Sequence, residues 1–531
     1  CLDRQADEAL LTEILDETSA RVSDELADQP AVEAAIRSTL GVTYLDLGDL
    51  EKAEDHVLGS LQTYQELDAE SADVAQSLNN MGVLRSVAGR YEEAVQYFED
   101  ALELRRRILG DTSEETADSM TDLGNALVRL GRFDEAEPLL RDALASKRAL
   151  HDGPHASVAL GINSLGNLLH HREAYDEAEA LYREALAMHR ETLGDDHPDV
   201  VVDLNNLAYL LRSRGDLEAS EPMFREVLEA NQRIYGPTHP KVAESLSNMG
   251  MILLARARFS EAEAYYRRAL EMQRETLGED NPDAATTLDS IGRIYRDRGD
   301  YTTARTYFRQ ALAMHRKTLG EEHSWVVSDL NNIAHSLMLD GRLEESEAVY
   351  REALELSLRA LGENDPTTLR LRHDIAGLLQ RQGDPEGAEE LFRKVLEGRL
   401  ATLGPAHPRV AVTQFELASL VESMGRTSEA EELFRASMEA YRGSFGPDHA
   451  ATAFAACRVA RFLHARGEFG QAEELLRHAS GVLEETYGRD TGRGSSGRIL
   501  LARTLAANGQ VEEARTILSL IHISEPTRPR L

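Results

Sequence analysis

The chain has 531 residues, of which 28% are charged, 42% are hydrophobic and 5% are aromatic, and its formal net charge is −35. So acidic a surface repels phosphates and anionic headgroups, which argues against binding to nucleic acid or to a membrane surface, and the regularly spaced hydrophobic residues argue against disorder. No apolar run approaches the roughly 18 residues of a membrane span, and the two cysteines, Cys1 and Cys457, are too few for a disulfide framework or a cysteine-rich metal site.

The first 32 residues, 1–32, are expected to form a leading helix and a linker. The chain opens with Cys1 and not with methionine, and no signal peptide is visible. We therefore expect the sequence to be a piece of a longer protein.

From residue 33 to residue 518 the sequence repeats itself every 42 residues. A turn residue, mostly glycine, a second small residue and a bulky, often aromatic residue recur at this step, together with a first small residue at Gly82, Gly124, Gly166, Ala208, Gly250, Gly292, Ala334, Ala376, Ala418, Ala460 and Ala502. Parallel rows over so many copies do not arise by chance, so the chain is a repeat protein of about twelve units, the last of them incomplete.

Each repeat is predicted to be a helix, a tight turn and a second helix. The turn glycine, Gly215 in one copy, follows a helix-like stretch and fits a left-handed helix cap. Glu173 and Ala257 replace it in two copies, where a positive φ would cost an ordinary residue about 1 kcal/mol. In the connection Leu-Gly-x-x-His-Pro, Gly194 is expected to end one repeat and Pro198 to begin the next. The bulky row is expected to fill the space between one helix pair and the next.

The repeat resembles the tetratricopeptide repeat, and the sequences Leu-Asn-Asn-Leu-Ala at 204–208 and Leu-Gly-Asp-Asp-His-Pro at 193–198 resemble its kinesin-light-chain type. Because one repeat cannot bury its apolar face alone, neighbouring repeats must stack. The resemblance implies an all-α fold, a right-handed α-α superhelix, in which the first helices of successive repeats line a concave groove that binds extended peptides.

The opening stretch carries a second resemblance. Asp28-Gln29-Pro30, running into Thr39-Leu40-Gly41, is similar to the start of the repeat region in large bacterial serine/threonine protein kinases. This resemblance implies that a kinase domain lies upstream of Cys1 in the parent protein.

The last thirteen residues, 519–531, break the pattern. They read SLIHISEPTRPRL, and their two prolines cannot continue the second helix of the last repeat. The segment is similar to translated adapter or vector sequence and is expected to be non-native.

The sequence contains no catalytic motif, neither a phosphate-binding glycine loop, nor a kinase element, nor a nucleophile elbow. We therefore expect this segment to be no enzyme, and we expect no cofactor and no metal. His170 and His171 are adjacent on a helix and point about 100° apart, so they cannot readily share one ion. The recurrent histidines of the connections are expected to be structural: His197, His239, His323, His407 and His449.

Candidate binding residues lie on the first helices. Positions three before, one after and four after the first small residue share one helical face, which is the concave face by the resemblance. In repeats four to eight this face carries Asn163, Asn167, His170, Asn205, Tyr209, Arg212, Ser247, Met251, Asp289, Arg293, Arg296, Asn331, His335 and Met338. In the last three repeats the first of these positions turns apolar, at Phe415, Cys457 and Ile499.

The asparagines of this face allow two interpretations. Asparagine is a poor helix former, so its repeated use needs a reason, and its amide can both donate to and accept from the backbone of an extended peptide. The arginines could hold a carboxylate. Alternatively, the asparagines bond across neighbouring helices and bind no ligand.

The leading functional prediction is a non-catalytic scaffold that binds a protein or peptide in its concave groove. Two alternatives stay open: the docking or sensor region of a larger bacterial serine/threonine protein kinase, and a structural spacer or self-assembly element. We expect no nucleic-acid partner and no membrane insertion of this segment. The expected location is the cytoplasm, or an extracytoplasmic compartment if a transmembrane helix precedes the repeats.

Overall fold

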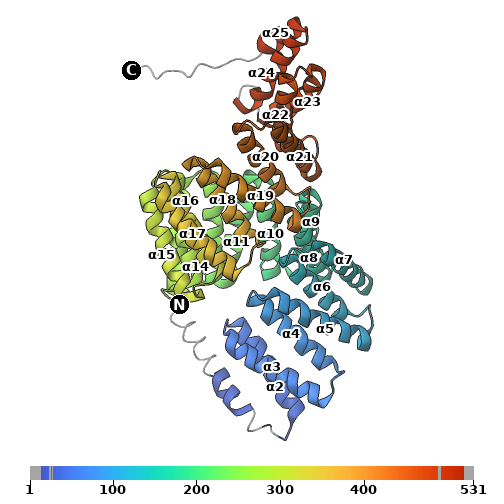
Figure 1. The fold of residues 1–531 in the computed structure, drawn as a ribbon. Helices are drawn as coiled ribbons and strands as arrows, with labels where there is room; N and C mark the ends of the chain where they lie inside the picture. The colour runs from blue at the N-terminus through green and yellow to red at the C-terminus, as the bar shows by residue number, and fades with distance from the viewer. Residues whose placement is uncertain (1–13, 23–25, 27, 488–491, 520–531) are drawn as a thin grey trace. The chain divides into compact units, whose positions relative to one another are not determined.

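The computed structural model describes residues 14–22, 26, 28–487 and 492–519, which form helices joined by short connections, with no strand among them (Figure 1). The chain divides into two compact units, Cys1–Gly278 and Glu279–Leu531. The all-α class predicted from the sequence is confirmed.

The first unit is a series of helices that alternate as first and second helices of the repeats. They are α2 (Pro30–Asp46), α3 (Leu50–Leu67), α4 (Ala72–Val87), α5 (Tyr91–Leu109), α6 (Glu114–Arg129), α7 (Phe133–Leu150), α8 (Ala156–His171), α9 (Tyr175–Leu193), α10 (Pro198–Arg214), α11 (Leu217–Tyr235), α12 (Pro240–Ala255) and α13 (Phe259–Leu277).

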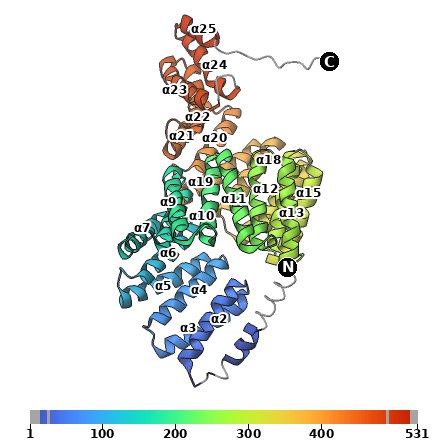
Figure 2. The ribbon, with the colours of Figure 1, turned by 180° about the vertical axis from the view of Figure 1, so that it is seen from behind.

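The second unit continues the same alternation. Its helices are α14 (Pro282–Asp297), α15 (Tyr301–Leu319), α16 (Ser324–Leu339), α17 (Leu343–Ala360), α18 (Pro366–Gln382), α19 (Pro385–Leu403), α20 (Pro408–Ser423), α21 (Thr427–Phe445), α22 (Ala450–Ala465), α23 (Phe469–Tyr487), α24 (Gly492–Ala507) and α25 (Val511–Ser519). In both units the even-numbered helix packs against the odd-numbered helix that follows it (Figures 1 and 2).

The turn inside each repeat has the predicted left-handed conformation. Gly215 caps α10 with φ at 91°, and its N–H donates to the carbonyl of Arg212. Glu173 and Ala257, which replace the glycine in their repeats, keep positive φ angles of 61° and 56°. The chain therefore holds the same turn at both positions and bears the strain of an ordinary side chain in the left-handed region.

The connection between repeats also follows the prediction. Gly194 caps α9 with φ at 84° and ψ at 162°, a conformation that only glycine adopts readily, and Pro198 is the first residue of α10. His197 is the N-cap of α10, where its Nδ1 accepts a hydrogen bond from the N–H of Asp199 at 3.2 Å. The equivalent histidines cap their helices in the same way, which confirms their structural role: His239, His323, His407 and His449.

The core is built from one contact that recurs in each repeat. The first small residue, on the first helix, packs against the bulky residue on the second helix. A Cβ added to Gly292 would lie 2.6 Å from Cε1 of Phe308, in the second helix of the same repeat. The bulky ring thus fills the space inside a helix pair, which the sequence analysis did not expect. The same row also reaches the next pair, since the rings of Phe434 and Phe462 lie 5.7 Å apart.

The helices of the repeats run from α2, which begins at Pro30, to α25, with which the described residues end at Ser519, and residues 14–22 form a further helix. Residues 1–13 of the expected leader and 520–531 of the expected non-native tail lie outside the described residues. Within the described residues, no helix is both long enough and apolar enough to cross a bilayer.

Candidate peptide-binding surface

The candidate binding residues lie on the first helices of both units. We call the positions three before, one after and four after the first small residue the first-helix face. In the first unit α8 carries Asn163, Asn167 and His170, α10 carries Asn205, Tyr209 and Arg212, and α12 carries Ser247 and Met251. In the second unit α14 carries Asp289, Arg293 and Arg296, and α16 carries Asn331, His335 and Met338.

Side chains of this face join successive first helices. The residue three before the small residue bonds a side chain 43 positions later, on the next first helix. We call this series the first-helix ladder: Asn79 with Asp122, Asn163 with Asn206 and Asn205 with Asn248 in the first unit, and Asp289 with Asn332 and His373 with Glu416 in the second. Repeated asparagines therefore have a structural use between repeats.

Asn163 is the most heavily bonded of the candidates. Its side chain, 5% exposed, donates to Oδ1 of Asp203 at 2.5 Å, and its Oδ1 accepts from Asn167 and from Asn206, both at 3.1 Å. Oδ2 of Asp203 in turn lies 2.6 Å from Nδ1 of His189. Both hydrogen-bonding ends of the Asn163 amide are thus engaged within the fold.

Three other polar candidates of the first unit, Asn205, Tyr209 and His170, also contact the next repeat. The hydroxyl of Tyr209 donates to Oδ1 of Asn248 at 2.7 Å, and Oδ1 of Asn205 accepts from the amide of Asn248 at 3.2 Å. His170 lies 3.1 Å from the hydroxyl of Ser213, and burial lowers the pKa of His170 to about 4, so its ring is neutral at neutral pH. Ser247 and Met251 are half-buried.

In the second unit the first-helix face carries one carboxyl with a strongly shifted pKa. Burial, and then the neighbouring Asp329, raise the pKa of Asp289 to about 6, and its Oδ1 accepts from Asn332 at 2.6 Å. Asn331 is 8% exposed, and its buried Oδ1 has no hydrogen-bond partner among the described residues. Burial and the charge of Arg296 lower the pKa of His335, which favours a neutral ring.

The arginines of the face differ in their engagement. Nε of Arg296 donates to Oδ1 of Asp297 at 3.0 Å. Within the described residues, no hydrogen bond or ion pair joins the guanidinium of the half-buried Arg212, or that of the exposed Arg293, to another side chain. These two arginines are therefore the candidates that the fold leaves most available to a ligand.

A pocket of about 470 Å³ opens on the first-helix face of the second unit. Its walls come from α16, α18 and α20, with one ring from α19, and comprise His335, Met338, His373, Asp374, Gly377, Gln380, Arg381, Phe392, Phe415, Glu416 and Ser419. Met338, Phe392 and Phe415 supply apolar surface, whereas Gln380 and Arg381 are exposed. The pocket can therefore receive an apolar side chain beside polar groups.

His373 supplies a positive charge at the base of this pocket. Its Nε2 lies 2.6 Å from Oε2 of Glu416, and its ring meets that of Phe392 edge to face at 5.3 Å. Burial opposes protonation, but the carboxylates of Asp374 and Glu416, which accept from the ring, outweigh burial and raise the pKa of His373 to about 9. The imidazole is thus protonated at neutral pH and paired with a carboxylate.

Sequence reasoning named two residues of this pocket, His335 and Met338, and missed the rest. The 42-residue spacing could have identified them, because five further pocket residues occupy first-helix-face positions of repeats nine and ten: His373, Gly377, Gln380, Phe415 and Ser419. The candidate set ended at repeat eight, before His373 in repeat nine and Phe415 in repeat ten, where the first of these positions turns apolar. The apolar residue taken as the end of the groove, Phe415, instead lines the pocket.

A second buried series was not predicted. Five second helices bond the following first helix through a pair of side chains 14 positions apart. We call these pairs the junction ladder: Arg105 with Ser119, His189 with Asp203, Asn231 with Ser245, His315 with Asp329, and Arg399 with Thr413. The two histidine–aspartate pairs are at most 3% exposed, so no substrate reaches them. They tie repeats together.

Comparisons with known proteins concern the repeat. Sequence models of the tetratricopeptide repeat match residues 32–106, 73–149, 157–231, 202–275, 242–317, 327–401, 373–443 and 409–485, and further repeat models match 121–191 and 495–519. No curated protein matches the chain.

Solved structures of helical repeat proteins are similar to parts or most of the chain. BtubC (BKLC) from P. vanneervenii is 23% identical, with 44% of this chain and 93% of that chain covered and a TM-score of 0.38. Nearly identical TPR-like repeats of a Podosopora anserina kinesin light chain are 24% identical, with coverages of 39% and 99% and a TM-score of 0.35. Yeast Tom70 is 14% identical, with coverages of 92% and 96% and a TM-score of 0.48.

Proposed function

Because the chain belongs to the tetratricopeptide repeat family, we propose that it is a protein-interaction scaffold that holds an extended segment of a partner protein on its first-helix face. The observation that carries this proposal is the pocket on α16, α18 and α20, which is built from equivalent positions of three successive repeats. An extended segment that crosses successive first helices meets the same positions at each repeat.

The chemistry of the pocket favours a peptide with one apolar anchor side chain. Phe415, which is half-buried, offers an aromatic surface, and removing an anchor of leucine or phenylalanine size from water contributes about 1.5–3 kcal/mol. Gln380 and Arg381 stand exposed at the same site and can bond the peptide backbone or a carboxylate.

In the first unit the same face offers fewer available groups. Asn163 is engaged on both ends of its amide, so we assign it to the stack and not to the ligand. Arg212 and Asn205 remain as candidate ligand contacts on α10.

The test is a selection of displayed peptides on the immobilised chain, followed by fluorescence anisotropy with a selected peptide. Phe415→Ala and Arg381→Ala are each expected to weaken binding at least tenfold, which corresponds to about 1.4 kcal/mol. Arg351→Ala is the matched control, because Arg351 is an exposed arginine on the second helix α17, away from the pocket residues. Far-UV circular dichroism checks that each variant is folded.

Two outcomes would count against the proposal. Selected peptides that bind Phe415→Ala and Arg381→Ala as tightly as the unchanged chain would place the binding surface elsewhere. A selection that yields no binding peptide, together with concentration-dependent oligomers in sedimentation, would favour the spacer or self-assembly alternative.

A further inference from the structure

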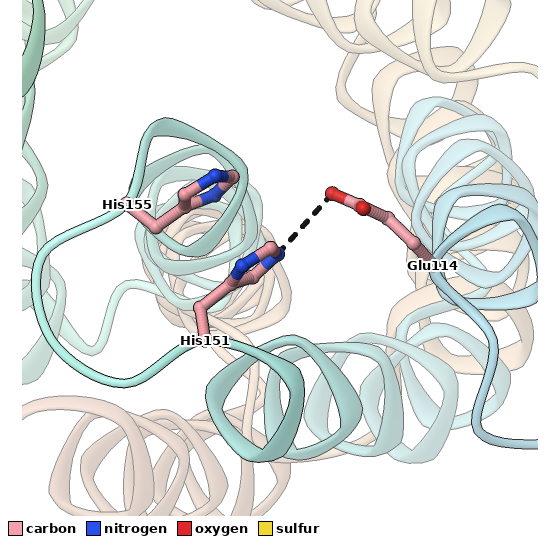
Figure 3. A group of neighbouring side chains, drawn as sticks. All are labelled: Glu114, His151 and His155. Carbon is pink, nitrogen blue, oxygen red and sulfur yellow. Dashed lines mark hydrogen bonds and ion pairs between the residues drawn. The ribbon is translucent and has the colours of Figure 1, made fainter.

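Three side chains with metal-ligating atoms meet outside the first-helix face, in the first unit. Glu114 is the first residue of α6, His151 follows the last residue of α7, and His155 is the N-cap of α8. One ligand atom from each lies within 4.8 Å of the other two. The carboxylate faces the two rings across the gap between the connections (Figure 3).

The distances within this cluster are already short. Nε2 of His151 lies 3.3 Å from Oε1 of Glu114, and the rings of His151 and His155 stack with centroids 3.5 Å apart. All three side chains are accessible, with Glu114 exposed and both histidines half-buried. An ion can therefore reach the cluster from solvent.

The repeat pattern accounts for His155 and for a ring stacked on it, but it does not account for a histidine at position 151. His155 occupies the position of the capping histidines, and its Nδ1 accepts from the N–H of Ser157 at 3.2 Å. His151 occupies the position of Leu193, Tyr235 and Leu277 in the following repeats. Tyr235 stacks on the capping His239 at 4.5 Å, so a phenol ring already serves the stacking. A histidine at this position adds a nitrogen ligand that stacking does not require.

We propose that Glu114, His151 and His155 form a site for a divalent transition-metal ion of the zinc class. Two imidazoles and one carboxylate are a donor set that Zn²⁺ takes, whereas Ca²⁺ and Mg²⁺ prefer oxygen ligands alone. Tetrahedral Zn²⁺ with bonds of about 2.0–2.1 Å sets neighbouring ligand atoms about 3.3 Å apart. His151 and Glu114 already lie at that separation, and the His155 ring must turn out of its stacking on His151 to direct a nitrogen at the same ion.

The tautomer of His155 affects how tightly the site binds an ion. When His155 binds the ion through Nε2, its remaining proton moves to Nδ1 and the hydrogen bond from Ser157 is given up. The site therefore binds less tightly than one whose ligands are already oriented.

The position of the site indicates what the ion does. Glu114 belongs to the connection before α6, and the two histidines belong to the connection before α8, so the ion joins two neighbouring repeats. Three protein ligands leave a fourth position for water or for a side chain of a bound partner.

The chain itself supplies conservative test variants, because other repeats carry a non-ligating residue at each position. His151→Leu copies Leu193, Glu114→Ala copies Ala156, and His155→Ser copies the capping Ser113. His197→Ser is the matched control, since His197 caps α10 as His155 caps α8 but has no second histidine beside it at the position of His151.

The experiment measures Zn²⁺ binding to the whole chain by competition with a chromophoric chelator, with X-ray absorption of the 1:1 complex as a second measurement. The affinity for the first, most tightly bound Zn²⁺ ion is expected to fall at least tenfold in His151→Leu, Glu114→Ala and His155→Ser. It is expected to stay unchanged in His197→Ser. The absorption spectrum is expected to show two imidazole ligands, and one after His151→Leu. Unchanged affinity in folded His151→Leu, or the same spectrum for both proteins, would overturn the assignment.

Discussion

Replacing Asn163 with alanine tests whether the asparagines of the first-helix face serve the stack or a ligand. The bond from Asn163 to the buried carboxylate of Asp203 is a hydrogen bond to a charged group, which contributes about 1.5–3 kcal/mol. The half-buried amides of Asn167 and Asn206 lose their acceptor, adding about 0.5–1.5 kcal/mol each unless water replaces it. Alanine recovers about 0.6 kcal/mol of helix propensity. The expected net destabilisation is about 2–5 kcal/mol.

The assay must report locally, because a stack of repeats need not unfold in a single step. Hydrogen exchange of the amides in α8 and α10, read by mass spectrometry, gives the opening free energy at this junction. Asn205→Ala, which breaks one bond of 3.2 Å, is expected to cost about 1 kcal/mol, and Arg212→Ala less than about 0.5 kcal/mol. Equal protection in Asn163→Ala and Arg212→Ala would refute the structural role of Asn163.

Three further predictions concern stability. Glu173→Gly is expected to stabilise the chain by about 1 kcal/mol, seen as a higher thermal midpoint, because Glu173 holds a φ of 61°; an unchanged midpoint would show that this turn carries no strain. Gly292→Ala is expected to cost about 1–2 kcal/mol in urea unfolding, since the new Cβ meets a ring at 2.6 Å, whereas Gly481→Ala, with open space around it, is expected to gain about 0.5–1 kcal/mol; two changes of the same sign would refute the packing argument. The pKa of His373 is raised to about 9, so its contribution to stability is complete below about pH 6.5 and is lost as the pH rises through 9. Its size is about 1–3 kcal/mol, reduced because Glu416 is 43% exposed, and unfolding of the unchanged chain and of His373→Gln should converge at pH 10.

Some features of the structure could be predicted from the sequence because they depend on one residue at a time. The turn at Gly215 needs a positive φ, the cap at Gly194 needs a conformation that only glycine adopts readily, and Pro198 can begin a helix because it has no N–H to lose. Where Glu173 replaces the turn glycine, the packing of the helices on either side still holds the positive φ. Local stereochemistry thus suffices for the helices and their borders.

Other features depend on pairs of residues whose chemistry changes from repeat to repeat. The equivalent positions hold arginine with serine at Arg105, histidine with aspartate at His189, and asparagine with serine at Asn231. No single residue type fills the position in every repeat, so a search for rows of similar residues passes over the junction ladder. The pocket was missed for the same reason, since His373 and Phe415 share a position with asparagines but not their chemistry.

The variety of these pairs also bears on how repeats with nearly the same backbone keep their order. A stack displaced by one repeat would keep every turn, every cap and most of the apolar contacts, so those features cannot distinguish the two arrangements. The junction ladder can distinguish them. After such a displacement His189 would meet Ser245 and lose its buried carboxylate partner, and the guanidinium of Arg105 would meet Gly161, which has no side chain to accept its hydrogen bond. An uncompensated buried charge costs about 3–5 kcal/mol, as much as a large part of a domain's net stability, so the displaced stack is strongly disfavoured.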